Sequence, residues 1–167
     1  MLLNCDLGES YGNWTMGQDE AVMPHIDQAS IACGFHGGDP VTMRRTLMLA
    51  KRHGVAVGAH PAYPDLAGFG RRSMALNHDE LHAALHYQIG ALDGMAHSIG
   101  LALSYVKPHG ALYNTIANDR TQARAVAEAV HAVDPGLPVL GLAGCRLPPA
   151  GAIIDYFSTP VVDGAAG

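Results

Sequence analysis

The sequence is poor in cysteine, in aromatic residues and in charged residues. Its three cysteines stand far apart among 167 residues and form no Cys-x-x-Cys pair, which argues against a disulfide framework and a structural zinc site. No run of about 18 apolar residues occurs, so no transmembrane helix is expected. The first residues lack the basic and long apolar regions of a signal peptide. We therefore expect a soluble protein of the reducing cytoplasm.

Basic residues are also scarce, with ten Lys and Arg against fifteen Asp and Glu and a net charge of −5. Without a basic run, neither nucleic acid nor a membrane surface is expected as a partner. No Gly-x-x-x-x-Gly-Lys-Ser/Thr string occurs, so any nucleotide would be bound without a P-loop. A composition of 49% hydrophobic and 15% charged residues is typical of a globular protein, and we expect residues 1–167 to form one domain.

Short apolar runs alternate with longer amphipathic patterns, which predicts parallel β–α units. Five strands are expected, at Met1–Asp6, Asp27–Cys33, Gly54–His60, Leu101–Lys107 and Leu137–Leu142. Three helices between them are expected to begin at Asp39, at Asn77 or His78, and at Asn118 or Asp119, and to end near His53, Gly100 and Val133. Two later segments are too short to count as a sixth and a seventh strand: Ala152–Ile154 and Pro160–Val162.

Polar residues follow four successive strands at their C-terminal ends, where parallel α/β proteins carry their active sites. In chain order these residues are Asn4, Asp6, Glu9, His36, Asp39, His60, Arg71, Lys107 and His109. The carboxylates of the first loop and the histidines of the second and third could hold a divalent metal or act directly as general acid and base. Lys107 could stabilise an oxyanion or a phosphate. This set of groups suits hydrolytic chemistry.

Simpler structural roles are open at several of these positions. Asp39 directly precedes a predicted helix and could serve only as its cap, and Asn4 could satisfy backbone groups near its strand end. His60 and His109 lie beside prolines in stiff turns at strand ends, which favours a functional role. A further set of histidines, spaced by four on one predicted helix, is more simply a solvated helix flank than a metal site: His78, His82 and His86.

Four ordered stretches of the sequence are distinctive: NCDLGESYG (Asn4–Gly12), SIACGFHGGDP (Ser30–Pro40), GAHPAYPDLAGFGRR (Gly58–Arg72) and VKPHGALYN (Val106–Asn114). Together they resemble the LamB/YcsF family. The resemblance extends from residue 1 to about residue 144, and the tail, residues 145–167, is atypical. It implies an α/β fold, a (β/α) barrel of the seven-stranded glycoside hydrolase/deacetylase type. Since only five strands are predicted, the chain would be a barrel truncated after about five βα units.

The resemblance also implies an activity. Members of the family take part in the ATP-dependent opening of 5-oxo-L-proline to L-glutamate, with ATP hydrolysed to ADP and phosphate, together with partner subunits B and C of the oxoprolinase. The family's motifs carry over onto Asp6, Glu9, His36, Asp39, His60, Arg71, Lys107 and His109. Among the polar residues at the strand ends we expect catalytic roles for Asp6, His60, Lys107 and His109, and substrate binding by Asn4, Glu9, His36, Asp39 and Arg71. ATP with Mg²⁺ is the expected cofactor, and a metal in the barrel is left open. Two alternatives remain, a metal-dependent amide or sugar hydrolase or deacetylase and a non-catalytic subunit that binds a small molecule.

Overall fold

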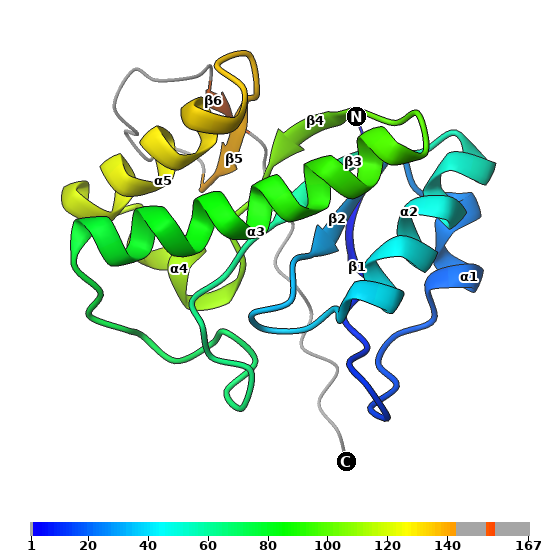
Figure 1. Ribbon diagram of the computed structural model, residues 1–167, viewed down its shortest axis with the longest axis horizontal. Helices are drawn as coiled ribbons and strands as arrows, with labels where there is room; N and C mark the ends of the chain where they lie inside the picture. The colour runs from blue at the N-terminus through cyan, green and yellow to red at the C-terminus, as the bar shows by residue number, and fades with distance from the viewer. Residues whose placement is uncertain (1, 143–152, 156–167) are drawn as a thin grey trace.

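The computed structural model describes residues 2–142 and 153–155 of the chain. Six parallel strands form one sheet in chain order: β1 (Asn4–Leu7), β2 (Gln28–Ala32), β3 (Ala56–His60), β4 (Leu103–Val106), β5 (Val139–Gly141) and β6 (Ile153–Asp155) (Figure 1). The connections carry α1 (Asp19–Val22), the 3-10 helix η1 (Met23–His25), α2 (Pro40–His53), α3 (His78–Ser98), α4 (Gly110–Thr115) and α5 (Arg120–Val133).

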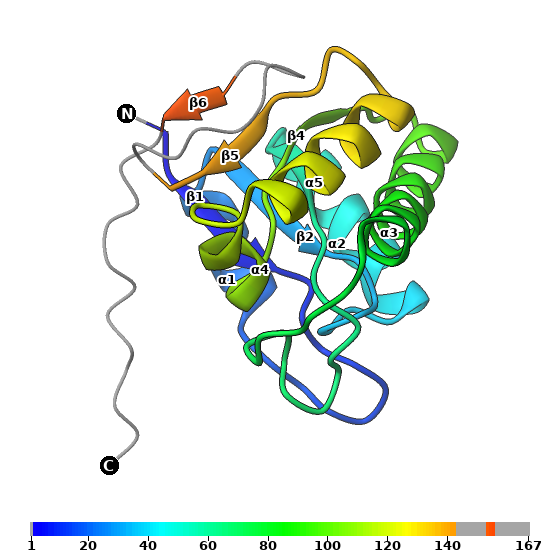
Figure 2. The same ribbon diagram turned by 90° about the vertical axis from the view of Figure 1, so that its left-hand side faces the viewer.

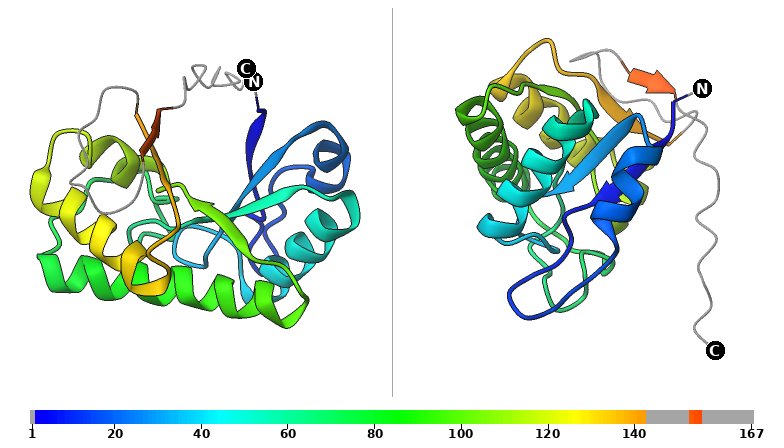
Figure 3. Two further views of the ribbon diagram at one scale, coloured as in Figure 1. Left: turned by 90° about the horizontal axis from the view of Figure 1, so that it is seen from above. Right: turned by 90° about the vertical axis from the view of Figure 1, so that its right-hand side faces the viewer.

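The sheet is curled, and its long helices lie on the convex side. Figures 1 and 2 show α2, α3 and α5 on one side of the strands. Seen from above, the edge strands β1 and β6 both lie on the side opposite α3 (Figure 3). The architecture is therefore a curled parallel half-barrel, and the part of the chain that the structure describes holds six strands rather than the seven of the expected barrel.

Successive side chains of each strand point to opposite faces of the sheet. The outward side chains of Ile31, Val57 and Val106 are fully buried and join the apolar stripe of α3, with Leu85 and Leu92, in the hydrophobic core. This packing is what the amphipathic pattern of the helices predicts, because a helix with one apolar stripe has to cover a sheet. Within residues 2–142 and 153–155, none of the helices combines the length and the apolar character that crossing a membrane requires.

The long helices begin at residues that cap them. The Asp39 side chain accepts hydrogen bonds from two backbone N–H groups of the first turn of α2, and Gly54 ends that helix with φ of 67°. Asn77 and Glu80 form a reciprocal capping box at the start of α3, and Asp119 caps α5. Each cap satisfies N–H groups that have no partner inside the helix, so these starting points follow from local sequence.

The strand β6 is a correction to the sequence-based expectation. It pairs in parallel with β5 through three residue pairs, from Val139↔Ile153 to Gly141↔Asp155. The expectation that Ala152–Ile154 is too short for a strand was wrong, because β5 is itself three residues long and a neighbour of equal length supplies the ladder. Pro160–Val162 and the rest of the tail lie outside the described residues.

One side chain, Tyr105 of β4, lies across the inner face of the sheet. Its register partner on β3 is Gly58, and a Cβ atom at Gly58 would lie 2.2 Å from the Tyr105 ring. The ring extends over this position, so its hydroxyl reaches Ser30 Oγ of β2 at 3.2 Å and accepts a hydrogen bond from Asn4 Nδ2 of β1 at 3.0 Å. Glycine at position 58 thus allows one side chain to join β4 to β1 and β2.

We predict that Gly58→Ala lowers the free energy of unfolding by about 1–3 kcal/mol, the usual cost of overpacking, because Tyr105 has to move. Urea unfolding followed by circular dichroism measures this change. Gly94→Ala is the matched control, since an added Cβ at this exposed position of α3 meets open space among the described residues. The control should raise stability by about 0.5–1 kcal/mol, because alanine is the better helix former. Equal effects of the two substitutions would contradict the packing of Tyr105 over Gly58.

Candidate functional site

The loops that follow β1, β2 and β3 gather at one edge of the sheet (lower edge in Figure 1), as the carboxyl ends of parallel strands do. At this edge Asp6 of β1 meets Lys107, the residue that follows β4. The Lys107 Nζ atom lies 2.6 Å from Asp6 Oδ1. Since β1 and β4 are not neighbours in the sheet, this contact depends on the curl of the sheet.

Asp6 is held between a lysine and a histidine. Its Oδ2 atom lies 3.3 Å from His60 Nε2, while its Oδ1 atom accepts from Lys107. Burial by itself raises the pKa of Asp6, but hydrogen bonds and attraction from His60 and Lys107 outweigh it and hold the pKa well below its usual range. The side chains of Asp6 and Lys107 are 35% and 23% exposed, so this pair is accessible to a ligand.

Three buried histidines lie beside this pair. The rings of His36 and His109 stack with centroids 3.7 Å apart, and His60 stands perpendicular to His109. Glu9 Oε1 lies 3.2 Å from His36 Nε2 and 3.7 Å from His109 Nδ1. Burial, reinforced by the neighbouring His60, lowers the pKa of His36 and of His109 to about 3, and burial raises the pKa of Glu9. Both of these histidines are therefore neutral near pH 7.

Backbone carbonyl groups determine the tautomers of two histidines. His60 Nδ1 lies 2.6 Å from the carbonyl oxygen of Lys107, and His109 Nε2 lies 2.9 Å from that of Phe69. A carbonyl oxygen can only accept, so each of these nitrogens carries a hydrogen. The two opposite nitrogens, His60 Nε2 and His109 Nδ1, face each other at 3.0 Å.

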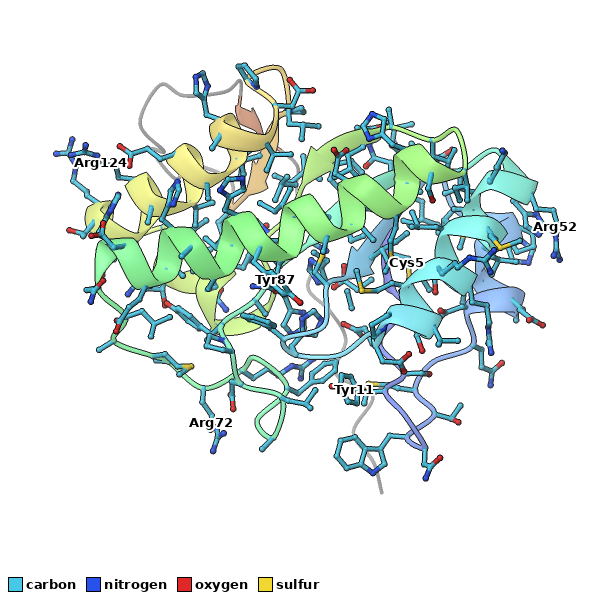
Figure 4. The ribbon with its side chains drawn as sticks, in the orientation of Figure 1. Cys5, Tyr11, Arg52, Arg72, Tyr87 and Arg124 are labelled. Atoms are coloured by element: carbon cyan, nitrogen blue, oxygen red, sulfur yellow. The ribbon has the colours of Figure 1, made fainter. Side chains whose placement is uncertain are left out.

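The loop after β3 holds these rings through a residue in an unusual conformation. Phe69 has φ of 53°, which is uncommon for a residue with a bulky side chain, and its ring packs edge-on against His36 and His109. Asp65 tightens the loop by pairing with Arg72 and by accepting from a backbone N–H group. Figure 4 shows Arg72 pointing away from the body of the molecule, and its side chain is 68% exposed. The buried carboxylate of Asp65 thus anchors the loop that presents the Phe69 carbonyl to His109.

Asn4 lies on the same inner face of β1 as Asp6, two residues before it. Its Oδ1 atom accepts from Ser30 Oγ at 2.9 Å and from Lys107 Nζ at 3.4 Å. Asn4 therefore ties Lys107 to the polar layer that it forms with Ser30 and Tyr105. The sequence analysis did not identify Ser30 and Tyr105 as site residues because they lie inside strands. Side chains alternate between the two faces of a strand, so Tyr105 could have been placed on the same face as Lys107.

Asp39 and Arg71 make contacts of their own beside this centre. The Asp39 carboxylate caps α2 and also accepts from the N–H of Gly12 at 2.9 Å, so the capping role that the sequence left open is the one observed. The Arg71 guanidinium lies over the Phe69 ring, 5.5 Å from its centroid. The part of these two residues in substrate binding stays a prediction.

Four residues of the site are of the types that bind metals. Glu9, His36, His60 and His109 each offer a ligand atom, and these atoms all lie within 4.8 Å of one another. Neutral imidazoles and carboxylates suit first-row divalent ions, and the same groups can also exchange protons. The arrangement is thus chemically suited either to hold a cation or to act as general acid and base.

We predict that Tyr105→Phe lowers the free energy of unfolding by about 0.5–1.5 kcal/mol, because the hydroxyl that Asn4 and Ser30 share is lost. Tyr87→Phe is the matched control, since Tyr87 is 65% exposed on α3 and should change stability by less than about 0.5 kcal/mol. Urea unfolding compares the two variants. A loss in Tyr105→Phe no larger than in the control would argue against a hydrogen-bonded layer inside the sheet.

Known proteins resemble the chain along most of its length. The model of the LamB/YcsF family matches residues 1–157. A 5-oxoprolinase A subunit (the one numbered 2) from Pseudomonas putida is 56% identical over 161 residues, which are 96% of this chain and 62% of that protein. Another 5-oxoprolinase A subunit (the one numbered 3), from Pseudomonas aeruginosa, is 59% identical over 143 residues, 86% of this chain and 57% of that protein. The chain thus spans about three fifths of the length of these curated relatives.

Solved structures share the fold. A lactam utilization protein from Thermus thermophilus matches with a TM-score of 0.85 and 54% identity, covering 86% of this chain and 58% of that one. A candidate cellobiose-phosphate cleavage protein from Enterococcus faecalis, 12% identical with a TM-score of 0.55, shares the fold alone. The resemblance carried by the four sequence stretches is therefore confirmed, and the chain belongs to the LamB/YcsF family.

Proposed function

We propose that this chain supplies the ring-opening site of a 5-oxoprolinase, which converts 5-oxo-L-proline and water to L-glutamate while ATP and water yield ADP and phosphate. Its relatives are named as 5-oxoprolinase components or as a lactam utilization protein, and these names support a lactam as the substrate class. The observation that carries the proposal is the partly exposed pair of Asp6 and Lys107, 2.6 Å apart beside buried histidines. This pair places a fixed positive charge and a carboxylate where one small substrate can contact both.

A five-membered lactam is an unactivated amide, so water attacks its carbonyl carbon slowly. Transfer of the γ-phosphoryl group of ATP to the carbonyl oxygen would give an imidate-like species that water attacks readily. The ammonium group of Lys107 is suited to stabilise negative charge on this oxygen or on the phosphoryl group. Asp6 and Asn4 hold the ammonium group in place, so little reorganisation is needed during the reaction.

Asp6 is suited to orient the attacking water. Its depressed pKa keeps it ionised, and its partly exposed side chain can accept a hydrogen bond from a water molecule. His60 is 1% exposed and His109 is 4% exposed, so a bulky substrate does not readily reach these rings. They contact the carboxylates of Asp6 and Glu9 instead. We therefore assign the direct contact with water to Asp6 and assign His60 to holding Asp6.

We assign the handling of ATP largely to partner subunits B and C. The relatives are named as the A subunits of 5-oxoprolinases, which implies further subunits in their complexes, and this chain contains no P-loop string. Such a division predicts that the chain alone opens little or no 5-oxoproline. Use of ATP is consistent with the cytoplasm that the scarcity of cysteine predicts.

We predict that Lys107→Met lowers kcat of the reconstituted three-subunit complex by about 100-fold or more, the usual effect of losing one group that stabilises developing charge. The measurement is glutamate formed from 5-oxoproline with ATP present. Lys51→Met is the matched control, because Lys51 is an exposed residue near the end of α2 that donates to the carbonyl of Ile99, and turnover should be unchanged. Normal glutamate formation by Lys107→Met would remove this residue from the mechanism.

Assays with and without ATP, each before and after chelation, separate the proposed activity from its alternatives. We expect turnover that requires ATP and the partner subunits. Turnover without ATP that is lost on chelation would instead identify a metal-dependent amide or sugar hydrolase. Binding of 5-oxoproline without turnover under every condition would identify a non-catalytic subunit.

A further inference from the structure

Two ring nitrogens face each other in the buried centre of the site. His60 and His109 each donate one ring N–H to a backbone carbonyl, which leaves His60 Nε2 and His109 Nδ1 opposed at 3.0 Å. When both rings are neutral, each of these nitrogens presents a lone pair, and two opposed lone pairs in a buried site are unfavourable. A cation shared by the two nitrogens relieves this conflict.

The spacing of the two nitrogens suits a shared metal ion. Bonds of about 2.0–2.1 Å at an angle between 90° and the tetrahedral value place two ligand nitrogens about 2.9–3.4 Å apart, and the observed separation is 3.0 Å. Histidines that bind metals usually donate their second ring nitrogen to a carbonyl or carboxylate, which fixes the ring. The carbonyl groups of Lys107 and Phe69 accept from His60 and His109 in this way.

Two carboxylates complete the set of donor atoms. Asp6 Oδ2 lies 3.3 Å from His60 Nε2, and Glu9 Oε1 lies 3.7 Å from His109 Nδ1. The Glu9 side chain is only 16% exposed, and a carboxylate so deeply placed requires a compensating positive charge. Lys107 already compensates Asp6, so a cation between the two nitrogens, whether a proton or a metal ion, compensates Glu9.

His36 is excluded as a fourth ring ligand by its orientation. Its plane lies 5° from that of His109 in a stack with centroids 3.7 Å apart. An imidazole binds a metal within its own plane, so an ion in the plane of His109 lies outside the plane of His36. His36 instead lies with Nε2 3.2 Å from Glu9 Oε1, which makes it a positioning residue for Glu9.

We propose that His60 Nε2, His109 Nδ1, Asp6 and Glu9 form a binding site for one first-row divalent metal ion, with Zn²⁺ as its probe. The chemistry assigned to the ion rests on the proposed lactam-opening function, whereas its binding rests on the geometry alone. A bound ion of this type polarises a carbonyl group and lowers the pKa of a bound water molecule. Its place beside Asp6 puts it next to the ammonium group of Lys107, where the lactam carbonyl is expected to lie.

The test measures metal binding by the full chain in the absence of lactam and ATP. Protein stripped with a chelator is dialysed against Zn²⁺, and the bound metal is counted by elemental analysis. We expect one ion per chain and, with Co²⁺ in its place, visible absorption bands that report ligation by nitrogen and oxygen. Glu9→Gln and His109→Ala should each weaken Zn²⁺ binding by about 100-fold or more, and His36→Phe by about 10-fold.

Surface histidines provide the control for adventitious binding. His82 and His86 follow His78 at spacings of four on α3, and His78 is paired with Glu128 of α5 at 2.8 Å. A variant with His82→Ala and His86→Ala should still bind one ion per chain with unchanged affinity. Circular dichroism checks that each variant is folded, and Glu9→Gln keeps the size of the side chain, so it remains informative if His109→Ala does not fold.

The proposal is overturned if the folded wild-type chain takes up no Zn²⁺, or if uptake disappears in the variant of His82 and His86 but persists in Glu9→Gln. In either case His60 and His109 share a proton instead of a metal. Stoichiometric binding without lactam opening by the reconstituted complex would count against the proposed function and leave the metal site established. Metal binding and lactam opening are therefore tested by separate measurements.

Discussion

The curl of the parallel sheet is the constraint on which the rest of the structure depends. In a flat sheet β1 and β4, separated by β2 and β3, would lie about 14 Å apart, three strand spacings. In this protein their inward side chains touch, through Asn4 with Tyr105 and through Asp6 with Lys107. These contacts join segments about a hundred residues apart in the chain, so the pair proposed to contact the lactam exists only when the sheet is correctly bent.

Glycine residues and backbone carbonyl groups make the contacts on the inner face of the curled sheet possible. Gly58 leaves room for Tyr105 to lie across the inner face, and Gly70 lies so close to His109 that a Cβ atom there would approach the ring to 2.9 Å. The carbonyl groups of Lys107 and Phe69 each accept from a buried histidine. Because backbone atoms move less than flexible side chains, these carbonyl groups help to fix the orientation of the two rings. The unusual conformation of Phe69 fits this view, since strained residues concentrate at functional sites.

The same geometry distinguishes two kinds of group within the site. Asp6 and Lys107 are partly exposed and suited to contact a substrate, whereas His36, His60 and His109 are buried and act through their neighbours. A carboxylate held between a lysine and a histidine stays ionised at neutral pH, while the buried imidazoles of His36 and His109 stay neutral. This separation of charged, accessible groups from neutral, buried ones suits a site that binds a small polar ring and directs water towards it.

The sequence by itself determined the parts of this protein that follow local rules. The caps at Asp39, Asn77 and Asp119, five of the strands and the placement of polar residues at strand ends all depend on neighbours within a few positions. Tertiary structure alone decided which of those polar residues meet. The opposed nitrogens of His60 and His109 depend on partners far away in the chain, and the strand β6 depends on pairing with β5. Hydrophobic periodicity predicts helices and strands, but no periodic pattern in the sequence encodes the distance between two side chains or the orientation of a ring.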